Sequence, residues 1–187
     1  TIARYYTPTG RCIQKEYTDD LETYYDDQNE RYENGEMYHI DSTYYVDSLK
    51  FVTPKGKIVY GGGGIFPDVF VAYDSTGTSW YLTQLRYSSA FTTFAFSYVQ
   101  TKRTKWKSPS SFYSQFNVTD EILEDFIQFA STEHDVKINR SELKHSKKLI
   151  KRFLKGEIAR QIWVEQGFYQ VINRTDNEVL KAIEHLR

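Results

Sequence analysis

The chain has 187 residues, enough for one domain or two small ones with a buried core. Its formal net charge of −1 excludes a protein that binds nucleic acid through overall positive charge, and no apolar run approaches the roughly 18 residues of a membrane-spanning helix. The only methionine is Met37 and the chain opens at Thr1, inside an expected strand, so we expect a piece of a longer protein.

Strands are expected in the N-terminal part. Alternating side chains predict a strand over residues 2–7, a turn at Pro8 to Gly10, and a second short strand over 11–15. Residues 17–41 read as irregular, with a helical turn around Thr18 to Tyr25. Further strands are expected at 43–53, 58–60 and 69–72, the first two joined by a hairpin turn at 54–57.

After residue 78 the apolar period changes from two to about 3.6, which predicts helices. Helical spacing covers 81–98, and helix starts are expected at Ser108, Thr119 and Asn139. Gly167 is expected to break the long helix that follows Asn139, and Thr175 to open a capping box before the last helix. The order predicts an α+β fold, with a strand-rich part at 1–75 and a helical subdomain at 76–187.

The charge is distributed unevenly. Residues 16–47 hold 11 acidic residues against Arg31 alone, together with seven Tyr, whereas residues 101–187 hold 16 Lys and Arg against 12 Asp and Glu. Either an acidic loop lies on a basic domain, or two surfaces are solvated separately. The Tyr content favours an ordered excursion that packs its rings against a sheet or a partner.

Two short strings resemble catalytic or phosphate-binding motifs. Gly61 to Gly64 lacks the helix and the Lys-Ser/Thr pair of a phosphate loop, so we interpret it as a close backbone passage. Ser141 and Lys144 match the Ser-x-x-Lys string of some acyl enzymes, but charged neighbours favour a solvated helix start.

No metal or cofactor site is expected. No pair among His39, His134, His145 and His185 has metal-ligand spacing on a helix, and a single cysteine, Cys12, excludes a disulfide framework or a Cys-based zinc site. Oxygen-rich clusters attract calcium, but the four residues Asp26, Asp27, Glu30 and Glu33 lack an EF-hand pattern and read as a solvated loop.

One basic and aromatic cluster remains. It consists of Lys102, Arg103, Lys105 and Lys107 around Trp106. Such a cluster suits an anionic partner or a lipid surface, but an inter-helix loop in solvent explains it equally simply, and we favour the loop. No nucleic-acid partner is expected.

Two segments together resemble a known family. Residues 4–14 are similar to the Tyr-Tyr-Thr-Pro-Ser-Gly-Arg-Ser-Ile-Gln segment of the carboxyl-terminal processing (tail-specific) serine proteases, peptidase family S41. Residues 64–69 resemble the Gly-Ile-x-Pro-Asp-Val segment that follows it, and residues 15–60 intervene as in longer Bacteroidetes-type members. The matching positions are Tyr5, Tyr6, Thr7, Pro8, Gly10, Gly64, Ile65, Pro67 and Asp68.

The resemblance implies a Ser/Lys endopeptidase of the bacterial cell envelope or periplasm. The family's Ser nucleophile, Lys base, supporting Gln and PDZ domain all lie upstream of the segment that matches Thr1, so no catalytic residue is expected in this chain. Thr9 and Cys12 stand where the family often has Ser, and neither is the expected nucleophile. We therefore expect the chain alone to be inactive, with protein or peptide substrates bound by the upstream part, and the matched residues to be structural.

Two other interpretations remain open. The acidic Tyr-rich excursion and the helices suit a module that binds a partner protein or an envelope component. Alternatively, the chain oligomerises through an unpaired strand edge at Arg4 to Gln14, or the helical subdomain holds an adaptor or a second copy.

Overall fold

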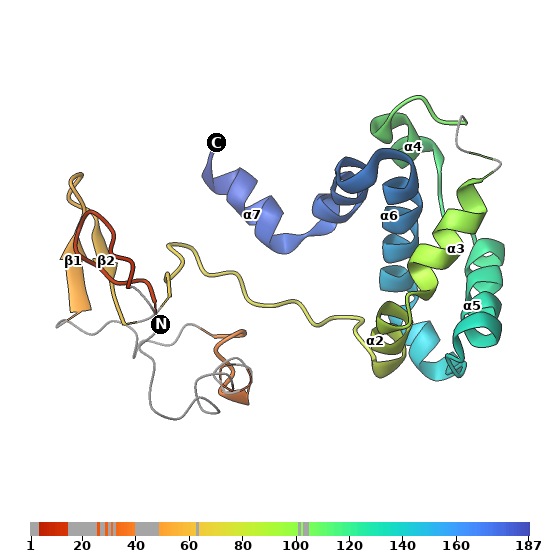
Figure 1. Cartoon of the computed structure of the whole chain (residues 1–187), viewed down its shortest axis with the longest axis horizontal. Coiled ribbons are helices and arrows are strands. Elements are labelled where there is room, and N and C mark those ends of the chain that lie inside the picture. Colours follow the sequence, from red (N-terminus) through yellow and green to blue (C-terminus); the bar gives the residue numbers. More distant parts are fainter. Residues whose placement is uncertain are drawn as a thin grey trace. The chain divides into compact units, whose positions relative to one another are not determined.

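The computed structural model describes residues 4–14, 26, 29, 31, 33–39, 49–62, 64–100, 102 and 105–187. The chain divides into two compact units, Thr1–Tyr73 and Asp74–Arg187 (Figure 1). The described part of the first unit contains a small antiparallel sheet, and the second unit is helical, which confirms the α+β class.

The sheet of the first unit is the expected hairpin. Strands β1 (Lys50–Val52) and β2 (Ile58–Tyr60) pair antiparallel, with Phe51 opposite Val59. The turn is closed by the Gly56 amide, which donates to the Thr53 carbonyl at 2.8 Å. Gly56 has φ of +80°, a conformation that favours glycine and fixes the turn at this position.

The other strands predicted in this unit are absent, short or outside the described residues. Residues 69–72 lie outside any strand, so that prediction is wrong; their apolar side chains have no described neighbouring strand, and a strand forms only against one. Within the described residues 4–14, strand pairing consists of one bridge between Tyr6 and Cys12. The predicted helical turn at 18–25 and the start of the strand at 43–48 lie outside the described residues.

Most helices of the second unit begin at a side-chain cap, and three of these caps were predicted. Ser79 caps α2 (Trp80–Tyr87), and the predicted caps Ser108 and Thr119 open α4 (Pro109–Gln115) and α5 (Asp120–His134). The continuous helical spacing at 81–98 is divided, because Ser89 adopts a left-handed φ of 63° and starts α3 (Ala90–Val99) in a new direction.

The longest helix, α6 (Arg140–Ile172), packs against α2, α3 and α4 (Figure 1). Asn139 caps it as predicted, by accepting from the Glu142 amide at 3.2 Å. The predicted break at Gly167 is wrong: the backbone leaves helical geometry at Trp163 and Val164, and Gly167 lies buried inside the helix.

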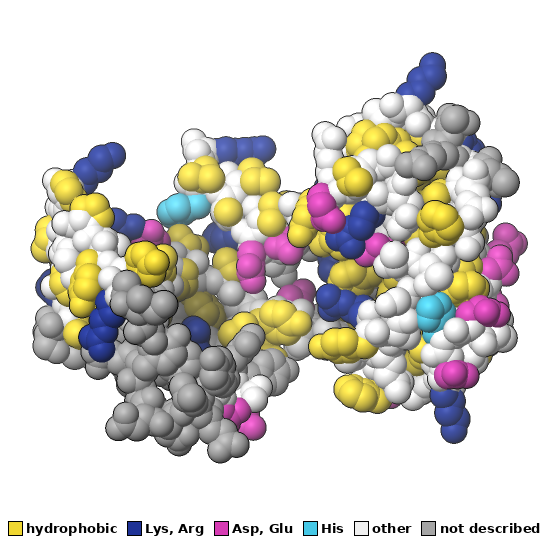
Figure 2. Space-filling model, in the orientation of Figure 1, with side chains coloured by type: hydrophobic (Ala, Val, Ile, Leu, Met, Phe, Trp, Pro, Cys, Tyr) yellow, Lys and Arg dark blue, Asp and Glu magenta, His cyan; other side chains and the backbone are white. Residues whose placement is uncertain are grey.

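The last elements are η3 (Asn173–Thr175) and α7 (Asn177–His185). The predicted cap is shifted by one residue: Asp176 accepts from the Val179 amide at 3.0 Å, while the Thr175 hydroxyl accepts from Arg152 at 2.7 Å. No residue of α7 is buried. Figure 2 shows hydrophobic side chains on the surface of α7. The exposed ones are Leu180 and Ile183, with Leu186 just beyond the end of the helix.

Aromatic side chains form the core of the helical unit. Phe126 of α5 is fully buried, stacks on Phe91 at 4.6 Å between ring centroids, and meets Phe94 edge-on at 5.4 Å. Phe112 of α4 packs edge-on against Trp106 at 4.9 Å. Burying each ring contributes about 1.5–3 kcal/mol, so α3, α4, α5 and α6 are held together chiefly by this cluster.

Among the described residues, no helix has both the length and the apolar character needed to cross a membrane. The length of α6 does not qualify it, because charged side chains run along it.

Candidate functional site

The two segments that carry the family resemblance lie against each other. The Gly64 amide donates to the Ile13 carbonyl at 2.7 Å, and Arg11 Nη1 donates to the Tyr60 carbonyl at 3.1 Å. Gly61 lies in the same place, where an added Cβ would be 3.0 Å from the Phe51 ring. Segments about 50 residues apart in sequence thus form one backbone junction.

The first segment is a tight loop held by its own hydrogen bonds. The Thr7 amide donates to the Arg11 carbonyl at 2.9 Å, the Gly10 amide donates to the Thr7 carbonyl at 2.9 Å, and the Thr7 and Thr9 hydroxyls lie 2.8 Å apart. Gly10 has φ of +81°, which explains glycine at this position. The matched residues Thr7 and Gly10 therefore shape the loop, and Pro8 lies at its turn.

Side chains of the junction point to solvent. Tyr5 is 73% exposed, Tyr6 61% and Ile65 70%. Pro67 and Asp68 are exposed too, and Asp68 pairs with Lys57. Every described residue of the first unit is at least partly exposed. An assembly of this kind offers an uncovered apolar surface, not an enclosed reaction site.

The positions Thr9 and Cys12 take part in local structure. The Thr9 hydroxyl is hydrogen-bonded to the Thr7 hydroxyl, and the Cys12 thiol donates to the Gln14 carbonyl at 3.6 Å. A nucleophile needs a base within hydrogen-bonding reach, and these contacts are to a hydroxyl and a carbonyl. The interpretation that neither residue is a nucleophile stays a prediction.

The other sequence motifs also occupy structural positions. Ser141 and Lys144 are both exposed in the first turns of α6, as a solvated helix start requires. No helix follows the glycine run until α2 begins at Trp80, and Gly63 lies outside the described residues.

The basic and aromatic cluster is divided by burial. Trp106 is in the core, whereas Lys102 lies 3.7 Å from the Tyr98 ring centroid and Lys107 is exposed. Because the indole is buried, it cannot stack on a base or enter a lipid surface. Arg103 lies outside the described residues.

The metal-ligating residue types do not gather in the described part of the chain. It holds no group of three or more His, Cys, Asp or Glu placed to bind a metal ion. Of the acidic residues weighed for calcium, Asp26 accepts from the Asn29 amide group at 2.6 Å, and Asp27 and Glu30 lie outside the described residues.

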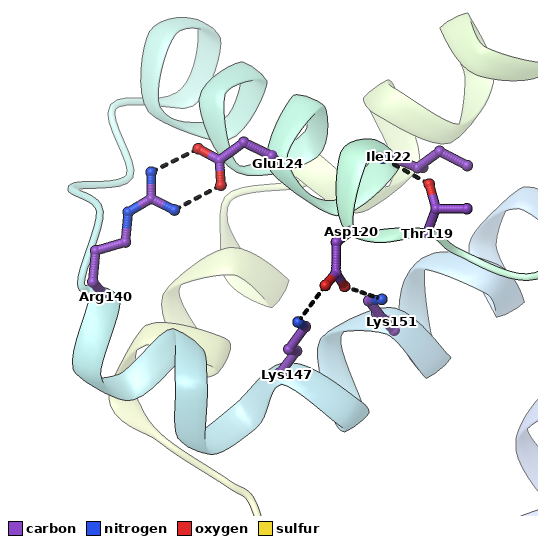
Figure 3. Close-up of polar contacts among 7 residues, drawn as sticks. All are labelled: Thr119, Asp120, Ile122, Glu124, Arg140, Lys147 and Lys151. Carbon is purple, nitrogen blue, oxygen red and sulfur yellow. Dashed lines mark hydrogen bonds and ion pairs between the residues drawn. The ribbon is translucent and has the colours of Figure 1, made fainter.

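The strongest polar arrangement of the helical unit joins α5 to α6 (Figure 3). Asp120 accepts from Lys147 at 2.8 Å and from Lys151 at 2.5 Å. Glu124 accepts two hydrogen bonds from the Arg140 guanidinium, both at 2.6 Å. The hydrogen bonds from Lys147 and Lys151 lower the pKa of Asp120 to about 2, and those from Arg140 and Gln128 lower the pKa of Glu124 to about 2.

This network fixes one helix on another. Its carboxylates are solvent-exposed and paired, and exposed ion pairs of this kind orient helices while adding modest stability. Sequence reasoning missed it, although a signal was present: Asp120 and Glu124 are one turn apart on α5, as are Lys147 and Lys151 on α6.

A second contact, between α2 and α6, was also missed. One carboxylate oxygen of Glu142 accepts from the Tyr81 amide of α2 at 2.6 Å, while the other accepts from the Asn139 side chain at 2.9 Å. The buried Ser146 hydroxyl donates to the Ser79 hydroxyl at 2.6 Å. Burial raises the pKa of Tyr81 to about 12. These groups position helices and show no arrangement of nucleophile and base.

Comparison with known proteins shows that part of the helical unit is similar to a protein family. Residues 81–164 match a family of unknown function, DUF8443. The matched range begins in α2 and ends at Val164, where α6 leaves helical geometry. No curated protein and no solved structure matches the chain.

Proposed function

We propose that this chain is the C-terminal part of a carboxyl-terminal processing serine endopeptidase. Residues 1–73 would then complete the sheet of the protease core, and residues 74–187 would form an attached helical unit. The proposal is supported by the paired motifs and by the hydrogen bond from Gly64 to Ile13 that brings them together.

The exposure of the first unit is the observation that carries the proposal. This segment is rich in aromatic and β-branched residues, yet none of its described side chains is buried, so the described residues form no core. Tyr5, Tyr6 and Ile65 would be covered by neighbouring strands of a larger sheet. This is the situation expected for one edge of a protease core.

In this proposal the chemistry belongs to the upstream part of the protein. A Ser hydroxyl attacks a peptide carbonyl only with a base beside it and donors placed for the oxyanion. The upstream part would supply the Ser, Lys and Gln of the family. The junction at Arg11 and Gly64 would hold residues 4–14 in place beside these catalytic residues. A cell-envelope location and unfolded or tail-exposed protein substrates are part of the same proposal.

The test compares this chain with the complete protein that contains it. The complete protein is expected to carry a Gly-Lys-Gly-x-x-Gln segment before Thr1 and a Ser further upstream, and to cleave a denatured protein. The chain alone should leave that substrate intact. Cleavage by the chain alone that is lost on replacing a Ser within residues 1–187, or a complete protein with a different upstream domain, would contradict the proposal.

A matched pair of variants in the complete protein tests the role of the junction. Arg11→Ala removes the hydrogen bond to the Tyr60 carbonyl and should lower kcat/KM about tenfold, because a displaced strand misplaces the neighbouring catalytic groups. Lys55→Ala, in the exposed hairpin turn, should leave activity unchanged. If the two substitutions change kcat/KM equally, the junction has no specific role in the proposed activity.

A second candidate function, a binding or assembly module without catalysis, is favoured by α7. A nine-residue helix with no buried residue is not stable by itself in water, so its apolar face suits a partner. This function and the protease are compatible if the helical unit recruits a substrate or an adaptor. The upstream sequence distinguishes a protease with such a module from a protein of another class.

A further inference from the structure

Helix α6 reverses its direction at a strained pair of residues. Trp163 has φ −126° and ψ 24°, and Val164 has φ 46° and ψ −141°. A positive φ is rare for any residue with a Cβ and is a genuine outlier for a β-branched one. Val164 is also 72% exposed, so no packing of its own side chain compensates for the strain.

The reversal makes two limbs, a long limb at residues 140–162 and a short limb at 165–172. Their backbones approach closely: a Cβ on Gly167 would lie 2.5 Å from the Ala159 carbonyl oxygen, and a Cβ on Gly156 would lie 3.1 Å from the Phe168 ring. Glycine at both positions is what allows this approach. The Arg160 guanidinium also lies 3.7 Å from the Phe168 ring centroid.

Polar contacts complete the fit between the limbs. Arg160 donates to Glu157 at 2.7 Å within the long limb and pairs with Glu165 of the short limb at 3.3 Å. Val171 of the short limb is buried, and Gln170 donates to Ser110 of α4 at 2.8 Å. The long limb and α4 thus form a complementary surface for the short limb, and the contacts of Phe168, Gln170 and Val171 lie away from the strained kink.

We propose that α6 exchanges its short limb between two copies of the chain. In the exchanged dimer Trp163 and Val164 become helical, α6 runs as one helix about 50 Å long, and each short limb packs on the long limb and α4 of the other copy. The second copy is the fitting occupant because it supplies the same residues, from Glu165 to Ile172, that fill this surface within one chain.

The balance between the two forms depends on the kink. Contacts of the short limb away from the kink recur in both forms, so they cancel. The remaining terms are strain relief and changed contacts at two kinks against the entropy lost on association. Short, strained hinges favour exchange for this reason. The proposal goes beyond the protease function and does not rest on it, because only the helical unit is involved.

The test is the oligomeric state of the 187-residue chain after incubation at several hundred micromolar, measured by size-exclusion chromatography with light scattering. We expect a dimer that reverts slowly on dilution, since each short limb must detach before exchange. Val164→Gly, which tolerates the positive φ and weakens a continuous helix, should lower the dimerisation constant at least about tenfold. Val164→Ala, which keeps a Cβ and favours helix, should hold the dimer fraction at or above that of the natural chain.

Two controls exclude other causes. Lys148→Gly weakens an exposed position in the middle of the long limb, which is helical in both forms, and Ile183→Glu disrupts the exposed apolar face of α7; neither should change the dimer fraction. The proposal is overturned by a monomer at every concentration, by a dimer that Val164→Gly leaves intact, or by a dimer that Ile183→Glu abolishes.

Discussion

The two units of this chain have similar shares of aromatic residues but use them differently. Of the 31 Phe, Trp and Tyr, 14 lie in residues 1–73 and 17 in residues 74–187. In the helical unit, rings such as Phe91, Phe112 and Phe126 stack in a closed core, whereas Tyr5 and Tyr6 of the first unit lie on its surface. Aromatic content therefore does not make a core; an enclosing set of elements does.

The same contrast separates the candidate functions. The first unit carries the residues that resemble a protease, and it lacks fully buried described side chains. The helical unit has a core and matches a family of unknown function. The part that suggests an activity is thus the part whose described side chains are all at least partly exposed, and this is why we assign the chemistry to a larger protein only as a proposal.

Amide hydrogen exchange on the whole chain should give the largest difference between the units. Amides in α3, α5 and the long limb of α6 are expected to exchange about a thousandfold or more slowly than those of β1 and β2, because exchange there requires opening of the packed core. Mass spectrometry of peptides from the two units measures the ratio. Similar protection in both would mean that the first unit is stable without neighbours.

A pair of Phe substitutions tests where the stability resides. Phe126→Ala should lower the free energy of unfolding of the helical unit by about 3–5 kcal/mol, because it empties a fully buried site between Phe91 and Phe94. Phe51→Ala, in half-buried β1, should leave the thermal unfolding of the helices unchanged. Circular dichroism at 222 nm measures both, and equal effects would show that the two units unfold as one.

A pair of Gly substitutions tests the packing of the two limbs of α6. Gly167→Ala should cost about 1–3 kcal/mol, because the new methyl group meets a backbone carbonyl that cannot move aside. Gly156→Ala meets the edge of the Phe168 ring and the end of Ile172, which can shift, so its cost should be smaller. Denaturant titration gives the order, and the reverse order would contradict the observed contact at Ala159.

The smallest effect is expected from acid. The pKa values of Asp120 and Glu124 are lowered to about 2 by their cationic partners, below their ordinary values of 3.8 and 4.5. Their contribution is therefore fully present above about pH 4.5 and is lost as the pH falls toward 2. The double substitution Asp120→Asn and Glu124→Gln should flatten the dependence of Tm on pH in this window.

Glu133→Gln serves as the control for the acid experiment, since Glu133 is an exposed carboxylate near the other end of α5. It should leave the slope of Tm against pH between 4.5 and 2 as it is in the natural chain. An unchanged slope in the double variant would mean that the network in Figure 3 adds nothing measurable to the helical unit.

Local signals in the sequence determined much of the secondary structure. The caps at Ser108, Thr119 and Asn139, and the hairpin turn at Gly56, were predictable because each is decided by a side chain or a φ value within a few residues. The α+β order followed from the change in apolar period near residue 78.

Only the tertiary structure decided where contacts between residues distant in sequence change a cap or a helix break from its predicted position. Arg152 donates to the Thr175 hydroxyl, and the cap of α7 is Asp176. Glu142 accepts from the Tyr81 amide, 61 residues away in sequence, as well as from the nearby Asn139 side chain. Gly167 was expected to end a helix, but it lies inside α6, where the lack of a side chain allows the Ala159 carbonyl to approach closely. The strained backbone conformation is at Val164. A local pattern specifies what a residue can do, and contacts distant in sequence select which of those options gains the most free energy.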